Sequence, residues 1–148
     1  MKIFRMQRAR SDRGAAAVEF ALVVPILLLI IVGIMNFGFV LAQQISLNSA
    51  ARQAARYAAV DGPTCSDVKT EGRASAETIG MGPSEVPTPV VTPCPDSPAK
   101  PCTGTLPGAE VTVTMTRVST WVITFPPFNV IPSPTLTGRG IMRCEFSK

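Results

Sequence analysis

The sequence contains no histidine, so it lacks the side chain that titrates most easily near neutral pH. Catalysis would therefore have to come from carboxylates, lysine or cysteine. No two of its four cysteines stand in C-x-x-C spacing, which disfavours a zinc site and a redox motif. We accordingly expect no catalytic residue, no enzymatic activity, no metal and no other cofactor.

Charge is almost missing from a long stretch near the N-terminus. Between Ala15 and Ala42 the only charged residue is Glu19. As a helix this segment would extend ~42 Å, which exceeds the ~30 Å hydrocarbon core of a bilayer. Residues 15–42 are therefore predicted to form a transmembrane helix.

All of the net charge precedes this apolar run. Residues 1–14 contain five basic residues and one acidic residue, which gives +4, and the remaining nine of each sign cancel. Positive residues beside a membrane-spanning helix stay on the cytoplasmic side. We expect residues 1–14 to be a basic cytoplasmic leader in the cytoplasmic membrane, with the C-terminal part extracytoplasmic. Because the basic segment adjoins a spanning helix, we expect a lipid partner and no nucleic acid.

The helical pattern continues beyond the apolar run. Alanines recur at helical spacing through residues 43–60, which predicts an extracytoplasmic extension of the same helix. Asp61-Gly62-Pro63 then supplies a stop signal. Pro25 removes one backbone hydrogen bond inside the helix and should kink it there.

The rest of the chain divides into a connection and a sheet. Residues 61–108 are predicted to hold a short helix and then a proline-rich connection. Three antiparallel strands are expected within residues 109–148, and we place them at 109–117, 118–125 and 136–146. Such a sheet is marginal alone, so it should pack on the alanine-rich half of the helix in an α+β fold.

Four cysteines follow the predicted membrane span, on the side where disulfides persist. They are Cys65, Cys94, Cys102 and Cys144. Four cysteines allow three pairings, which the sequence leaves open. We favour the short loop Cys94–Cys102 together with Cys65–Cys144, which would tie the end of the chain back toward the helix.

The residues around Glu19 resemble a sequence motif of a known protein family. The stretch GAAAVEF begins at Gly14 and ends at Phe20, and it resembles the G-x-x-x-x-E-F form of the prepilin signal of type IV pilins. With the basic leader, Pro25 and the alanine-rich extension, the sequence resembles the TadE-like minor pilins (pseudopilins) of tight-adherence, or Flp-type, pili. The closing LTGRGIMRCEF is similar to the last strand of that family.

The resemblance implies a type IV pilin-like fold and a role in pilus assembly. A prepilin peptidase would cut between Gly14 and Ala15, and Glu19 would pair with the new amino group of Ala15 on a neighbouring subunit. The partners it implies are this peptidase, the major pilin, other minor pilins and the inner-membrane assembly platform. The work would be architectural.

The sequence leaves several alternatives open. Glu19 can lie at the cytoplasmic headgroup level beside the arginines of the leader, with no further role. Val40-Leu41-Ala42 resembles a signal-peptidase site, although the apolar run is longer than the usual ~7–15 residues of a secretion signal. A membrane-tethered enzyme is a weaker alternative. The last is a single-pass, signal-anchored ectodomain with a scaffold or adhesive role unrelated to pili.

Overall fold

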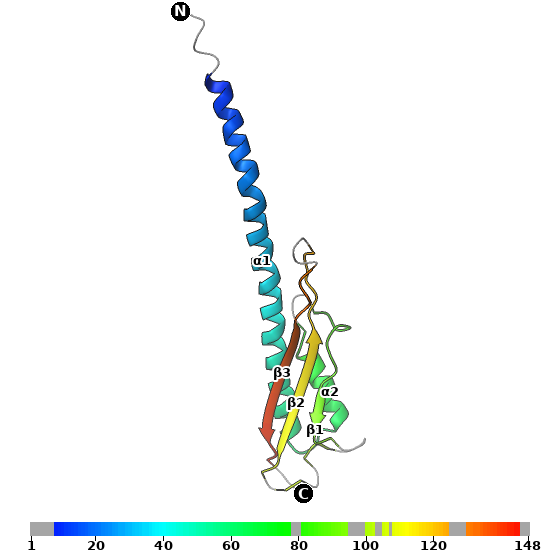
Figure 1. The fold of residues 1–148 in the computed structure, drawn as a ribbon. Coiled ribbons are helices and arrows are strands. Elements are labelled where there is room, and N and C mark those ends of the chain that lie inside the picture. The colour runs from blue at the N-terminus through cyan, green and yellow to red at the C-terminus, as the bar shows by residue number, and fades with distance from the viewer. Residues whose placement is uncertain are drawn as a thin grey trace, which may run out of the picture. The chain divides into compact units, whose positions relative to one another are not determined.

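The fold is described here from a computed structural model. The structure describes residues 8–77, 81–94, 100–102, 105–106, 108–124 and 130–145. Its elements are α1 (Arg8–Ala59), α2 (Cys65–Ala74), β1 (Val90–Thr92), β2 (Glu110–Val118) and β3 (Thr135–Arg143), as Figure 1 shows. The chain divides into two compact units, Met1–Phe37 and Gly38–Lys148, which we call unit 1 and unit 2. A long helix with a small antiparallel sheet confirms the predicted α+β class.

The helix α1 is 52 residues long and runs unbroken through Pro25. It begins at Arg8, earlier than the predicted start at Ala15, because nothing between these positions stops a helix. Gly14 is the one glycine in this stretch, and a glycine inside a helix reduces helix stability by ~1 kcal/mol relative to alanine. The helix ends at Ala59, whose carbonyl accepts a hydrogen bond of 3.2 Å from the backbone N–H of Glu145. Gly62 follows with a φ of +131°, so the predicted stop is confirmed.

The short helix α2 starts at a capping box. The Thr64 hydroxyl accepts a hydrogen bond from the backbone N–H of Asp67, and the Asp67 carboxylate accepts one of 2.8 Å from the backbone N–H of Thr64. These reciprocal bonds satisfy two donors that the first turn would otherwise leave unpaired. Hydrogen bonds from the side chain and then the backbone of Thr64 lower the pKa of the Asp67 carboxyl. The predicted second helix is confirmed, with its end at Ala74.

The three strands form one antiparallel sheet in the order β1-β2-β3. The predicted strand at 118–125 is wrong, because β2 ends at Val118 and no strand occupies residues 119–124. The backbone leaves the sheet at Ser119, whose N–H donates to the carbonyl of Pro134 at 2.9 Å. The third strand is instead β1, which comes from the proline-rich connection. As a three-residue edge strand it tolerates prolines at both ends.

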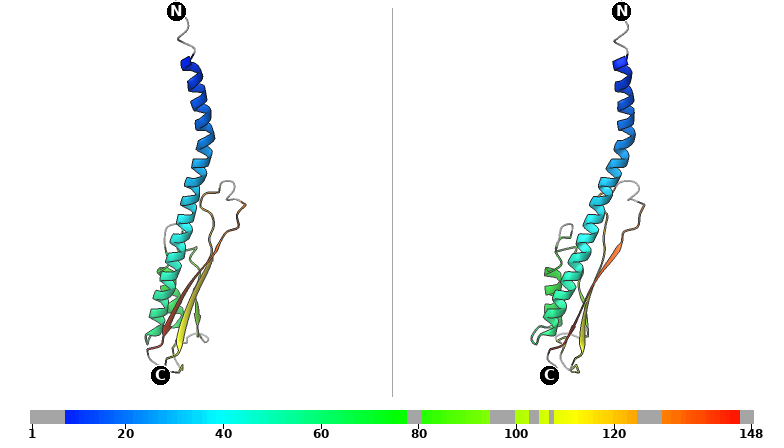
Figure 2. Two further views of the ribbon diagram at one scale, coloured as in Figure 1. Left: turned by 60° about the vertical axis from the view of Figure 1, so that its left-hand side comes forward. Right: turned by 90° about the vertical axis from the view of Figure 1, so that its left-hand side faces the viewer.

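The core of unit 2 lies between the sheet and the C-terminal part of α1, whose cyan-to-green ribbon runs beside β3 and β2 in both views of Figure 2. On β2 buried residues alternate with more exposed ones, and Val111, Val113 and Met115 are fully buried, as expected for a strand with one face in the core. The helix contributes small side chains and one large one to this core: Leu47, Ala50, Ala51, Ala54, Ala55 and Ala58. Alanines let the helix backbone approach the sheet closely.

Two glycines of β3 allow the closest approach between helix and sheet. A Cβ atom on Gly138 would overlap the backbone carbonyl of Leu47, and one on Gly140 would overlap the carbonyl of Ala51. Gly138 pairs with Met115 of β2, so both glycines lie on the core face of the sheet. The helix backbone therefore packs directly on the β3 backbone at these positions.

We predict that Gly138→Ala or Gly140→Ala destabilises unit 2 by about 1–3 kcal/mol, since the added methyl group must push α1 away from β3. Thermal unfolding of the full chain in detergent, followed by circular dichroism, should give a lower Tm for each. Gly82→Ala is the matched control, because no atom lies within 4 Å of a Cβ at that position. Equal Tm values for all three variants would contradict this packing.

Candidate functional site

The first half of α1 has an apolar surface that the described residues of unit 1 leave exposed. Every side chain from Gly14 to Ile31 is exposed except that of Val24, which is half-buried. Phe20 is 71% exposed. By length and composition this helix can cross a membrane, and none of its most apolar window is buried. Such a surface requires lipid or other apolar helices around it.

Glu19 is the single charge on this surface. Its carboxylate is exposed and lies between two apolar residues, Val18 and Phe20. Among the side chains described from residue 14 onward, none forms an ion pair with it. An ionised carboxylate in hydrocarbon is costly and is usually paired. A positive partner for Glu19 would have to come from outside the described chain.

The predicted processing site is fully accessible within the chain. Among the described residues, no atom lies within 4 Å of a Cβ placed on Gly14, and Ala15 is exposed. Both residues lie inside α1, one helical turn before Glu19. A cut between them would remove the first helical residues, 8–14, and leave Ala15 as the new terminus of the helix. Cleavage there, the kink at Pro25 and the assembly role of Glu19 and Phe20 stay predictions.

All four cysteines form disulfides, but the favoured pairing is wrong. The structure joins Cys65 to Cys94 and Cys102 to Cys144. Cys65 opens α2, which contacts β1, and Cys94 follows β1 by two residues. The prediction favoured Cys94–Cys102 because these two residues are close in sequence. The position of β1 in the fold instead brings Cys94 next to Cys65.

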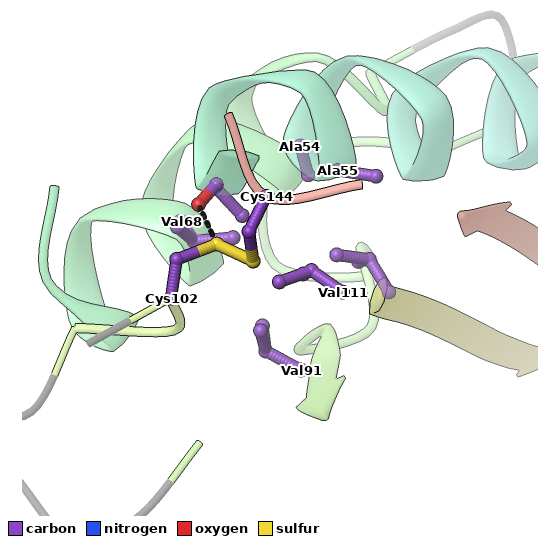
Figure 3. Packing of buried hydrophobic residues seen from close by; sticks show 9 residues of the cluster. Ala54, Ala55, Val68, Val91, Cys102, Val111 and Cys144 are labelled. Carbon is purple, nitrogen blue, oxygen red and sulfur yellow. Dashed lines mark hydrogen bonds between the residues drawn. A yellow bond between two sulfur atoms is a disulfide. The ribbon is translucent and has the colours of Figure 1, made fainter. Parts of the chain in front are cut away.

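The Cys102–Cys144 bridge lies in the core at one end of unit 2. Figure 3 shows it among Val68, Val91 and Val111, below the last turns of α1. The Cys102 sulfur lies 3.4 Å from the carbonyl oxygen of Ala58. The bridge therefore links the proline-rich connection, the end of β3 and the end of α1. A small domain with few large core side chains gains stability from such a link.

The opposite end of unit 2 is held by polar side chains that sequence reasoning missed. The buried Ser119 hydroxyl donates to the Gln43 side-chain carbonyl at 2.7 Å. The next residue, Gln44, donates from its side chain to the Thr137 backbone carbonyl at 2.9 Å. The only sequence signal of these two hydrogen bonds is the pair of adjacent glutamines directly after the apolar run. Together they fix α1 to the start of the β2–β3 connection at Ser119 and to β3 at Thr137.

In the parts of the chain that the structure describes, no cluster of three acidic or cysteine side chains could hold a metal ion. The described ion pairs are surface pairs, such as Lys100–Asp61 at 3.4 Å, except that the Arg117 side chain paired with Glu85 is nine-tenths buried.

One known protein family matches part of the chain, and the match lies within α1. Residues 14–56, or 43 of 148, match the sequence model of a family described as TadE-like protein. The match begins at Gly14 and includes Glu19, Phe20 and Pro25, while the sheet lies outside it. The TadE-like resemblance seen in the residues is thereby confirmed, and it associates the chain with tight-adherence pilus systems. No curated protein and no solved structure matches the chain.

We predict that single cysteine variants will report the pairing. In Cys102→Ala the thiol set free should be that of Cys144, since these two sulfurs are bonded. Alkylation under non-reducing conditions, followed by peptide mass mapping, identifies the free thiol. Cys65→Ala is the matched variant and should free Cys94. Recovery of alkylated Cys94 from the Cys102→Ala chain would contradict the structure.

Proposed function

We propose that this chain, whose residues 14–56 are TadE-like, is a minor pilin, or pseudopilin, of a tight-adherence type IV pilus. A prepilin peptidase cuts it between Gly14 and Ala15, and it is then assembled into the filament or primes its assembly. The observation that carries this proposal is Glu19. It is the lone charge in the apolar run, it is exposed, and none of the described side chains forms an ion pair with it.

The proposed topology is a single pass through the cytoplasmic membrane. The +4 segment before residue 15 favours a cytoplasmic N-terminus. The two disulfides of unit 2 support an oxidising, extracytoplasmic location for the C-terminal part. The charge of the N-terminal segment and the disulfides of the C-terminal part therefore favour the same orientation.

Cleavage would change the electrostatics of the helix end. Before the cut, the nitrogen of Ala15 is a neutral amide and the leader carries +4. After the cut, the leader is gone and Ala15 has an α-amino group, which is largely protonated near neutral pH. The processed helix therefore carries one positive and one negative group near one end of an otherwise apolar surface.

These two groups can pair between neighbouring chains. Ala15 and Glu19 are four residues apart, which corresponds to ~6 Å along the helix axis. A second chain shifted by about one helical turn would bring its Ala15 amine to the level of the first chain's Glu19. Within an apolar bundle such a pair satisfies both charges, whereas an isolated carboxylate is strongly disfavoured. Glu19 would thus set the register of successive subunits.

The small residues near this point support close helix contact. Ala15, Ala16, Ala17 and Ala21 have short side chains, and all are exposed on α1. Small residues let the backbones of membrane helices approach one another. The proposed partners are the prepilin peptidase first, then the major pilin, other minor pilins and the inner-membrane assembly platform.

We predict that Glu19→Ala and Glu19→Gln leave membrane insertion and cleavage intact but reduce incorporation into filaments at least tenfold. Neither variant can neutralise the Ala15 amine of the neighbouring chain. Loss of one partner of a buried pair typically costs ~3–5 kcal/mol, more than tenfold in an equilibrium constant. The measurement is the ratio of chain in sheared filaments to chain in membranes.

Glu77→Ala is the matched control, since Glu77 is an exposed glutamate of unit 2. It should be incorporated like the unmodified chain. Normal incorporation of Glu19→Ala would refute the assembly role and leave the alternative of a membrane-anchored scaffold or adhesive ectodomain.

A further inference from the structure

The connection between β2 and β3 has an unusual composition. From Val118 to Gly138 the chain has 21 consecutive residues without a charge, bounded by Arg117 and Arg139. The segment includes Trp121, the only tryptophan of the chain. Residues 119–134 of this run connect β2 to β3, and a connection between strands normally runs over the surface and carries charged residues, so this one requires a physical reason.

We define the hairpin tip as the described residues 118–124 and 130–134 of this connection. Its large apolar side chains are exposed: Val118, Val122, Val130 and Ile131. The Trp121 indole N–H donates to the backbone carbonyl of Ile131 at 3.0 Å, which holds the two limbs of the connection together. The exposed side chains therefore gather at one place on unit 2.

The hairpin tip lies at the end of unit 2 where α1 continues into the apolar run. Ser119, at the base of the tip, bonds to Gln43, the residue directly after Ala42. The other end of the sheet lies beside the end of α1, because Glu145 donates to the carbonyl of Ala59. Figure 1 shows the arrowhead of β2 pointing toward the end of unit 2 that carries the tip.

The helix is also apolar and exposed at this level. Leu41 and Ile45 flank Gln43 in sequence and point away from the Gln43–Ser119 bond, since each is ~200° from Gln43 around the helix. The opposite end of unit 2 is charged and carries the surface pairs Lys100–Asp61 and Arg143–Glu110. At the end with the hairpin tip, unit 2 therefore exposes apolar side chains on both the helix and the sheet side, next to the Arg117–Glu85 ion pair.

We propose that the hairpin tip inserts into the outer interfacial region of the same membrane that α1 spans, with lipid as its partner. This inference rests on the proposed single-pass insertion and does not depend on cleavage or filament assembly. The 28-residue apolar run is ~42 Å long, close to the ~40–45 Å of a bilayer with its headgroups. Gln43, and with it the base of the tip, then lies at the headgroup level.

The side chains of the tip suit that level. Tryptophan is enriched at membrane–water interfaces, where its apolar ring and its N–H are both accommodated. Valine and isoleucine gain from leaving water, and the absence of charge avoids a desolvation cost. The tip gives unit 2 a second attachment beside α1, which holds the domain against the bilayer before assembly.

The single tryptophan allows a direct test on the unmodified full chain. The chain is reconstituted into phosphatidylcholine vesicles with and without dibrominated acyl chains, and flotation confirms insertion. Brominated lipid should at least halve the Trp121 emission, and acrylamide added from the water should quench it less than in the denatured chain. No variant is needed for this measurement.

A matched pair of variants locates the contact on the tip. Val130 and Leu106 are 80% and 81% exposed, and each lies in a connection of unit 2. The Leu106 carbonyl accepts a hydrogen bond from the backbone N–H of Ala109, and the Ala109 carbonyl accepts one from the N–H of Cys144, so Leu106 lies at the opposite end. Val130→Asp should weaken the quenching by brominated lipid, and Leu106→Asp should leave it unchanged.

Three results would overturn the inference. A chain that floats with the vesicles while brominated lipid fails to quench Trp121 refutes it and leaves the proposed function intact. Protection from acrylamide without quenching by brominated lipid also refutes it, because protein then covers the tip. A chain that does not insert at all refutes both this inference and the proposed function.

Discussion

The carboxylate of Glu19 is the constraint on which the account depends. The chain places it on an apolar helix surface that unit 1 leaves exposed, and no described side chain pairs with it there. In lipid such a group is stable only with a positive partner or near the headgroups. A processed Ala15 amine on an adjacent chain is a partner that the same sequence can generate. Under the proposed function, α1 would be both an anchor and an assembly element.

Unit 2 is built to accompany that helix. Its core relies on backbone approach, with alanines on α1 facing Gly138 and Gly140 of β3, and two disulfides compensate for the few large core side chains. The helix α1 belongs to both units, because its apolar first half is exposed in unit 1 and its second half is part of the core of unit 2.

The sequence predicts the elements that depend on local pattern. The long helix, its stop after Ala59 and the alternation of β2 follow from periodicity and from Gly62-Pro63. The sequence did not predict what depends on tertiary placement. A three-residue strand between prolines has no periodicity to detect, and residues 119–124 contain strand-forming side chains but pair with no strand. The disulfide partners and the Gln43–Ser119 bond likewise depend on where β1 and the hairpin lie.

The central claim is that proteolysis supplies the partner of Glu19. The most direct measurement is the N-terminal sequence and intact mass of the protein recovered from sheared filaments and from membranes. The account predicts that the filament form begins at Ala15 and has lost the first 14 residues. A filament-associated chain that still begins at Met1 would contradict it.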